Sequence, residues 1–284
     1  MLRTFNLSQF WRLLKVFAIN SLACVGILVL LAELYNLFAP DQVTKHGGTI
    51  AALVGACAIG YGLWRAWPRP VEEEYAKPKA KIRIVVGDLF DQDCNLVIGM
   101  TSTFDTAVPH IIGRSSIQGQ FLARVYGQDV KALDNDLEVA LDAYQPVNSI
   151  SKAGKTLEYE IGTVAVIRHQ RKHYFCVAYT QMNTENEASS TVDHVWTSLS
   201  RVWNSVRARC NGEAVAVTVL GGGLSRLSSI MPAYDAIRLT VLSYMLASRR
   251  SPVCERLDIV VQPQVADRLD MRELQSFLQS LKET

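Results

Sequence analysis

The sequence lacks a strong charge of either sign. Its 284 residues include 29 Lys and Arg and 27 Asp and Glu, which gives a formal net charge of +2 at pH 7. A nucleic-acid-binding protein needs a strongly basic face, so this balance argues against a nucleic-acid partner. The chain also lacks a run of like charges long enough to mark a disordered tail. Its function therefore has to be sought in other parts of the sequence.

The motifs of metal centres and of common hydrolases are also missing. None of the six cysteines forms a C-x-x-C pair or lies at zinc-ligand spacing from a histidine, and unpaired cysteines fit a reducing compartment. H-E-x-x-H and G-x-S-x-G are both absent. The glycine run at Gly221 to Gly223 matches neither G-x-G-x-x-G nor a P-loop. We therefore predict no catalytic residue, no metal site and no resident cofactor.

Long apolar runs, in contrast, are present twice near the N-terminus. The first runs from Val16 to Phe38 and the second from Gly47 to Trp67, with a short turn around Pro40 between them. At about 1.5 Å per helical residue, each is long enough to cross a hydrocarbon core of about 30 Å. The first run is too long for a signal peptide, and no small-residue cleavage site follows it. Residues 1–67 are therefore predicted to form a transmembrane helical hairpin, with spans at about 16–38 and 47–67.

Positive charge predicts the orientation of this hairpin. Arg3, Arg12 and Lys15 precede the first span, and basic residues surround or follow the end of the second span. The turn contains a single fixed positive charge, Lys45. Because positively charged flanks stay on the cytoplasmic side, both termini and everything after the hairpin are predicted to be cytoplasmic, with the lipid bilayer as a partner.

Polar and small residues inside the spans leave two interpretations open. Glu33 either reaches the membrane interface or pairs between subunits of an oligomer. Gly55, Ala56, Gly60 and Gly62 allow close helix packing, either within one hairpin or between chains.

The rest of the chain has the pattern of a soluble α/β domain. Residues 68–80 are rich in proline and charge and are predicted to be a linker, so the domain is expected at 81–284. Short apolar runs alternate with segments of helical periodicity, which is typical of a layered α/β fold. The expected strands are Ile82–Val86, Asn95–Met100, Thr163–Arg168, Tyr174–Tyr179, Ala214–Leu220 and Leu257–Val261, and the expected helices are Ser116–Tyr126, Val130–Tyr144, Thr191–Arg209, Ile230–Ser248 and Asp267–Lys282.

Two strand-to-loop corners of this domain could bind a ligand. Asp88 follows the first strand, where its carboxylate could accept a hydrogen bond from an adenine amino group or a ribose hydroxyl. An aspartate capping a turn or helix is the alternative. The glycines at Gly221 to Gly223 lie between a strand and a helix, where backbone N–H groups can approach an anion. A simple turn is the alternative there.

Together, the order and spacing of these corners resemble a macro domain, over about Lys81 to Thr284. The resemblance implies a macro-like, three-layer α/β/α domain that binds an ADP-ribose-like ligand. In macro domains the aspartate after the first strand holds adenine, the loop after the second strand contacts the distal ribose, and the glycine-rich loop holds the diphosphate and distal ribose. These roles map to Asp88 with Leu89 beside it, to Thr101, Ser102 and Thr103 within the loop from Met100 to Asp105, and to Gly221, Gly222, Gly223, Leu224 and Ser225.

One departure bears on activity. Macro-domain hydrolases usually carry asparagine in the loop after the second strand, whereas this chain has MTSTFD there. The departure favours a sensor over an enzyme. The competing hypothesis, a membrane-tethered enzyme that processes ADP-ribose, has Asp105 as its only candidate acid in that loop.

A hairpin followed by a divergent macro domain is similar to the effectors of type II Thoeris anti-phage systems. That resemblance implies a bacterial inner-membrane protein that senses a signal made by a TIR-domain enzyme. The signal is derived from ADP-ribose and carries an amino acid such as histidine. Binding would drive homo-oligomerisation of the spans and membrane disruption. A membrane scaffold without a nucleotide ligand is the third hypothesis.

Overall fold

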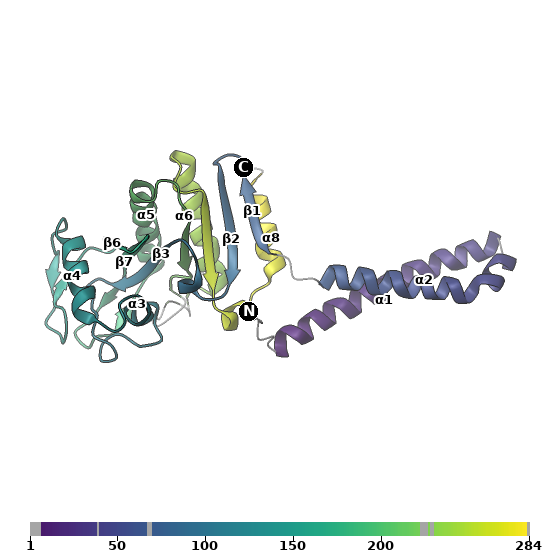
Figure 1. Ribbon diagram of the computed structural model, residues 1–284, viewed down its shortest axis with the longest axis horizontal. Helices are drawn as coiled ribbons and strands as arrows, with labels where there is room; N and C mark the ends of the chain where they lie inside the picture. The colour runs from purple at the N-terminus through teal and green to yellow at the C-terminus, as the bar shows by residue number, and fades with distance from the viewer. Residues whose placement is uncertain (1–6, 39, 67–69, 222–226, 228–229, 283–284) are drawn as a thin grey trace. The chain divides into compact units, whose positions relative to one another are not determined.

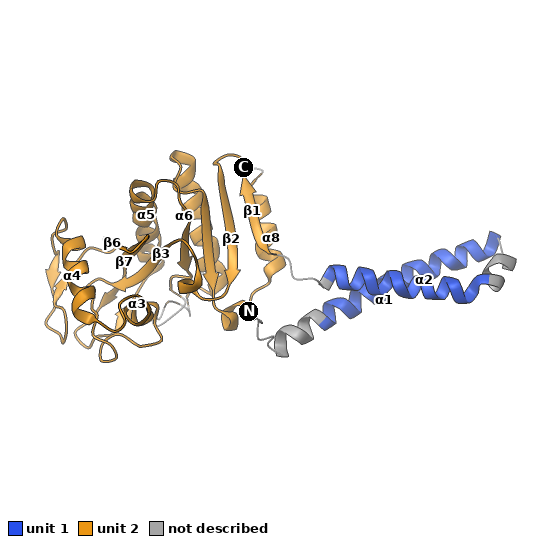
Figure 2. Cartoon of the chain, in the orientation of Figure 1, with its two compact units in different colours: residues 1–69 blue, residues 70–284 orange. Residues whose placement is uncertain are grey.

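The structure is a computed structural model that describes residues 7–38, 40–66, 70–221, 227 and 230–282. The chain divides into two compact units, residues 1–69 and 70–284 (Figure 2).

The first unit is a pair of helices, α1 (Leu7–Phe38) and α2 (Pro40–Ala66). Each contains an apolar stretch long enough to cross a membrane, at Leu14–Phe38 and His46–Arg65. The helices extend beyond the predicted spans, and the predicted turn is wrong over residues 40–46, which belong to α2. Proline is favoured at the first position of a helix, so Pro40 begins α2 instead of forming a turn.

A glycine sets how closely the two helices approach. A Cβ atom on Gly62 would fall 2.0 Å from the Ser21 Oγ and 2.8 Å from the Phe17 Cδ2. Ala58, one turn earlier on α2, is also buried. The small residues at these two positions of α2 therefore bring it into contact with α1.

The second unit is built around a mixed eight-stranded sheet of order β1-β2-β10-β9-β3-β7-β6, with β8 paired to β7 (Figure 1). The central strands β2, β10, β9, β3 and β7 are parallel, and β1, β6 and β8 are antiparallel to their neighbours. The strand bounds are β1 Val71–Tyr75, β2 Ala80–Val86, β3 Asn95–Thr101, β6 Val164–His169, β7 Lys172–Met182, β8 Ala188–Ser189, β9 Val215–Thr218 and β10 Arg256–Val261.

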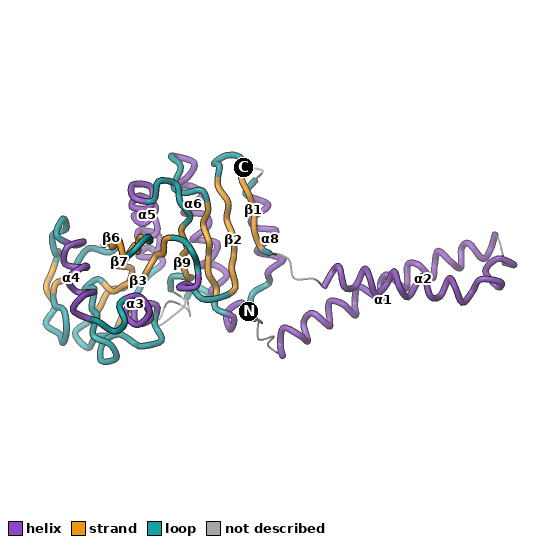
Figure 3. The backbone as a smooth tube through the Cα atoms, in the orientation of Figure 1, coloured by secondary structure: helices purple, strands orange, loops and turns teal. Residues whose placement is uncertain are grey.

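Helices cover both faces of the sheet, because its central strands are apolar on both sides. Val97 of β3 belongs to one core cluster, and its neighbours Leu96 and Ile98 belong to the other. The first cluster packs under α5 (Val192–Arg209), α6 (Ala233–Arg250) and α8 (Met271–Ser280), and the second under α3 (Ile117–Val125) and α4 (Val130–Leu141) (Figure 3). The predicted three-layer α/β/α class, preceded by a helical hairpin, is confirmed.

The predicted linker is wrong over most of its length. Residues 71–75 form β1, and β2 begins at Ala80. Val71 and Tyr75 are buried, and the Tyr75 hydroxyl donates to the Leu278 carbonyl at 2.8 Å. Glu73 lies on the same face of the strand, 12 % exposed and paired with Lys282, whereas Glu74 is exposed. A charged sequence is common in edge strands, and for this reason the composition resembled a linker.

Further differences are at element ends and in small elements. The last predicted helix, Asp267–Lys282, is shorter in the structure, where α8 begins at Met271. The short helix α7 (Pro263–Ala266) and a two-stranded hairpin, β4 (Asn148–Ser149) with β5 (Leu157–Glu158), were not predicted. Strands of two residues carry too little periodicity to be recognised from sequence.

Candidate functional site

The candidate corners lie at one edge of the sheet. Because β2, β10, β9, β3 and β7 are parallel, their carboxyl ends share this edge, which we call the carboxyl edge. Asp88 follows β2, the loop of residues 102–106 follows β3, and Gly221 follows β9. Ligands of open α/β sheets bind outside the carboxyl ends of the strands. The structure therefore brings the three predicted segments to the edge where a ligand site is expected.

Asp88 lies at the surface, with its side chain 39 % exposed. It caps the short 3-10 helix η1 (Leu89–Asp91), because its Oδ1 accepts the Phe90 N–H at 2.8 Å. Its Oδ2 accepts from the Arg124 guanidinium of α3 at 2.6 Å. Leu89 is buried in the core beneath. The capping role and a ligand role are compatible, because a carboxylate oxygen has a second lone pair for a further donor.

Arg124 links the aspartates of this corner. Its other guanidinium nitrogen donates to Asp91 at 2.9 Å, and its guanidinium lies 5.4 Å from the centre of the Phe90 ring. The hydrogen bond to Asp91 raises the pKa of Arg124 above its already high ordinary value, so the side chain stays charged. No pattern in the sequence pointed to Arg124, which lies on α3, 36 residues after Asp88.

The loop after β3 has its side chains turned inward. Thr101, Ser102 and Thr103 are between 0 and 5 % exposed. The Ser102 hydroxyl donates to Glu158 at 3.1 Å, and the Thr103 hydroxyl donates to Asp105 at 2.5 Å. Main-chain groups here are also paired, because the Ser102 N–H donates to the Thr180 carbonyl and the Phe104 N–H donates to the Thr101 carbonyl.

Asp105 is the centre of a buried network. It forms an ion pair with Lys152 at 2.7 Å, in which the two side chains are 1 % and 0 % exposed. Its Oδ1 accepts the Lys155 N–H at 2.8 Å, and its carbonyl accepts from the Gln118 amide. A buried carboxylate needs this many partners, because its desolvation costs several kcal/mol. Asp105 is thus occupied by structural contacts.

Lys152 belongs to the segment between β4 and β5, which folds over the loop after β3. Gly154 in that segment has φ +85°, and a Cβ there would fall 2.4 Å from Asp105 Oδ1. The network joins residues 47 apart in the chain, and the sequence contains no pattern that pairs them.

The glycine-rich corner is described only at its first residue. Gly221 is buried and has φ +90°, and a Cβ there would lie 2.8 Å from Leu227 Cδ2. The predicted ligand residues Gly222, Gly223, Leu224 and Ser225 lie outside the described residues. Gly221 therefore fixes where this loop begins at the carboxyl edge.

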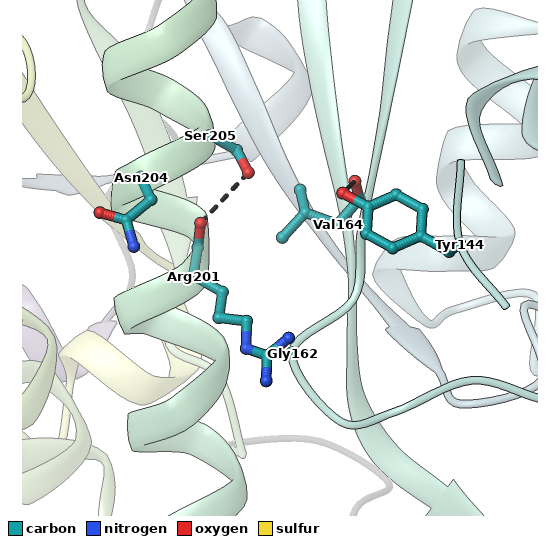
Figure 4. Close-up of a pocket in the computed structure, with 6 residues that line it drawn as sticks. All are labelled: Tyr144, Gly162, Val164, Arg201, Asn204 and Ser205. Atoms are coloured by element: carbon teal, nitrogen blue, oxygen red, sulfur yellow. Dashed lines mark hydrogen bonds between the residues drawn. The ribbon is translucent and has the colours of Figure 1, made fainter. Parts of the chain in front are cut away.

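A separate hollow of about 190 Å³ lies between α5 and the start of β6 (Figure 4). Its polar groups already have partners: the Tyr144 hydroxyl donates to the Val164 carbonyl, the Ser205 hydroxyl to the Arg201 carbonyl, and Arg201 to Glu160. It brings together none of the predicted site residues.

The sheet order and the corners at its carboxyl edge define a macro domain. The Oceanobacillus iheyensis macrodomain with MES bound is 12 % identical, with a TM-score of 0.50 over 76 % of this chain and 99 % of that one. A mutant of the same macrodomain in a structure with ADPR is also 12 % identical, with a TM-score of 0.50 over 75 % of this chain and 100 % of that one. At this identity the similarity shows the fold.

The family follows from the sequence match. Residues 82–262 match the family model described as Thoeris protein ThsA, Macro domain, so this chain belongs to that family and is a Thoeris defence protein. The Thoeris protein ThsA of Bacillus amyloliquefaciens (strain Y2) is 22 % identical over 205 residues, which cover 70 % of this chain and 68 % of that protein. The resemblance stated from the sequence is confirmed.

Proposed function

We propose that this chain is a membrane effector of Thoeris anti-phage defence, whose macro domain senses an ADP-ribose-derived signal. The single observation that carries the proposal is the family match over the domain in which Asp88 and the glycine-rich corner share one sheet edge. One solved protein of the same fold has ADPR in its structure. We expect the signal to be an amino-acid conjugate such as histidine–ADP-ribose, made by a TIR-domain enzyme.

In this proposal, Asp88 binds the adenine of the ligand. Its carboxylate is exposed, and Arg124 and the Phe90 N–H hold it in one orientation. The loop from Gly221 to Ser225 holds the diphosphate through backbone N–H groups, which needs neither a lysine nor a metal. The segment that contains Thr101, Ser102 and Thr103 lies beside the distal ribose.

We propose binding without turnover. Asp105, the only acid available in the loop after β3, is enclosed with Lys152 and has no exposed oxygen surface to offer a substrate. The loop contains no asparagine. A sensor needs neither a free acid nor an asparagine in this loop, because its ligand acts by binding one of two conformational states more tightly than the other.

The hairpin is proposed to span the bacterial inner membrane with both termini in the cytoplasm, and to oligomerise when the ligand binds. Gly48, Ala52, Ala56 and Gly60 of α2 are exposed and recur every four residues, whereas Ala58 and Gly62 are buried. Such a small-residue surface permits close packing against a helix of another chain. Clustering of the spans is the proposed route to membrane disruption.

Calorimetry with ADP-ribose tests the ligand site. Both core clusters lie within residues 71–278, so residues 70–284 are the fragment to use. Asp88→Ala should weaken binding by about tenfold or more, because it removes a charge-assisted hydrogen bond of about 1.5–3 kcal/mol.

Asp91→Ala is the matched control, because it removes the same charge and the other partner of Arg124. Its affinity should stay within about threefold of the wild type. Equal losses in both variants would contradict the adenine role of Asp88. If the wild-type fragment bound neither ADP-ribose nor its histidine conjugate, the sensor proposal would be wrong, and a scaffold role would take its place.

A further inference from the structure

A groove between α5 and α6 lies on the face of the sheet that carries these two helices. It has a volume of about 310 Å³, and its lining includes Trp196 and Leu246, which are 38 and 48 % exposed. The helices are held together beneath it, because the Trp203 indole N–H donates to the Ser243 hydroxyl at 2.9 Å. The groove therefore has a rigid base and an apolar, partly exposed lining.

The groove is basic, because Arg207 and Arg250 line it and no aspartate or glutamate does. Arg207 is fixed by donating to the carbonyls of Ala247 and Ser251 at 3.0 and 3.1 Å. Tryptophan and arginine together are the residues most enriched at the energetic centres of protein interfaces.

Acidic charge collects on the opposite face of the sheet. Residues 129–142, which include α4, contain five acidic residues and one lysine. Glu138, Val139 and Asp142 are exposed, and the Val139 side chain is 79 % exposed. We call these three residues the acidic knob. The knob therefore presents one apolar side chain and two carboxylates, which complement the apolar lining and the arginines of the groove.

We propose that the acidic knob of one chain docks in the basic α5–α6 groove of a second copy. Knob and groove lie on opposite faces of the sheet, so one chain cannot join its own pair. The contact is therefore head-to-tail, and a pair of copies keeps one free knob and one free groove. Repetition of such a contact builds rings or filaments. This proposal rests on the oligomerisation included in the proposed function. It assigns to that oligomer a contact between the macro domains of neighbouring chains.

The C-terminal ends of α5 and α6 lie away from the ligand corners. Both helices return from the carboxyl edge, so their last residues lie at the opposite edge of the sheet, where the Glu255 N–H donates to the Gly212 carbonyl. Arg207 and Arg250 are near these ends, so a partner chain bound to them leaves the ligand corners open.

Charge reversal tests the contact. The full-length chain is studied in detergent with ADP-ribose present, and its assembly is measured by sedimentation velocity. Glu138→Arg and Arg250→Glu alone should each weaken assembly by about tenfold or more, because like charges then face each other. Mixing the two variants should restore assembly, since each then meets an opposite charge. Arg272→Glu, an exposed reversal on α8, is the control and should assemble like the wild type.

Assembly unchanged in both single variants, or no restoration on mixing, would overturn the proposal. Loss of binding to phosphatidylglycerol vesicles by Arg250→Glu without loss of assembly would also overturn it, in favour of a lipid surface. Calorimetry with ADP-ribose on the same samples separates the two proposals, because Arg250 ends α6 at the edge opposite the ligand corners, so Arg250→Glu should leave ligand binding intact. A chain that binds ADP-ribose while the reversals have no effect keeps its proposed function and loses this contact.

Discussion

The two polar corners that the sequence places after β2 and β3 differ in what their side chains do. Asp88 is 39 % exposed, and the ion pair that it forms with Arg124 is at the surface. Asp105 is 1 % exposed and is paired with Lys152 beneath the β4–β5 segment. Both are aspartates in loops at the carboxyl edge, yet the first is available to a ligand and the second supports the fold. A polar loop at this edge is therefore no proof of a binding residue.

The largest effect on stability is expected from Lys152→Met. The change leaves the Asp105 carboxylate buried without its charged partner, and removing one member of a buried pair costs about 3–5 kcal/mol in the free energy of unfolding. Urea unfolding of residues 70–284 measures it. The double variant Asp105→Asn, Lys152→Met should recover part of the loss, because no charge is then buried. A loss below about 1 kcal/mol would mean that the pair is solvated like the one at Asp88.

Gly154→Ala should have the next largest effect. Its φ of +85° strains any other residue, and the new Cβ would also meet Asp105 Oδ1 and Ile111 Cδ1. We expect a loss of about 2–3 kcal/mol in the same urea experiment. Gly127→Ala is the matched control, because Gly127 has φ +58° with nothing within 4 Å of the new Cβ, and it should lose only about 1 kcal/mol. Equal losses would show that the segment over Asp105 is not closely packed.

Arg124→Met should have the smallest effect. It breaks two surface ion pairs, each of which is worth about 0–1 kcal/mol in most proteins. Urea unfolding should therefore change little, in contrast to Lys152→Met. A loss in the free energy of unfolding as large as that of Lys152→Met would show that the surface pairs of Arg124 support the fold as much as the buried Lys152–Asp105 pair does. The difference drawn between the two corners would then be wrong.

Much of the fold could be predicted because its signals are local. The apolar run of β3 and the one-sided periodicity of α5 each identify their element without knowledge of the rest of the chain. Asp88 and Gly221 were found because each directly follows a predicted strand. β1 was missed because its three glutamates hide the buried Val71 and Tyr75, which are recognisable only once β2 is known to lie beside them.

The contacts that decide the role of each corner could not be predicted. Arg124 reaches Asp88 from α3, and Lys152 reaches Asp105 from a segment held by two-residue strands. Such pairs depend on how distant segments pack, and no spacing in the chain encodes them. For this reason Thr101, Ser102 and Thr103 resembled ligand residues in the sequence, although their side chains face the interior of the domain.

Hydrogen–deuterium exchange of residues 70–284, with and without ADP-ribose, tests most directly the claim that the carboxyl edge binds the ligand. We expect slower exchange in peptides that cover residues 87–91 and 219–231, and unchanged exchange in peptides that cover residues 271–280 of α8, which belong to neither proposed site. Protection confined to the α5–α6 groove, or no protection at any peptide at a saturating ligand concentration, would contradict it.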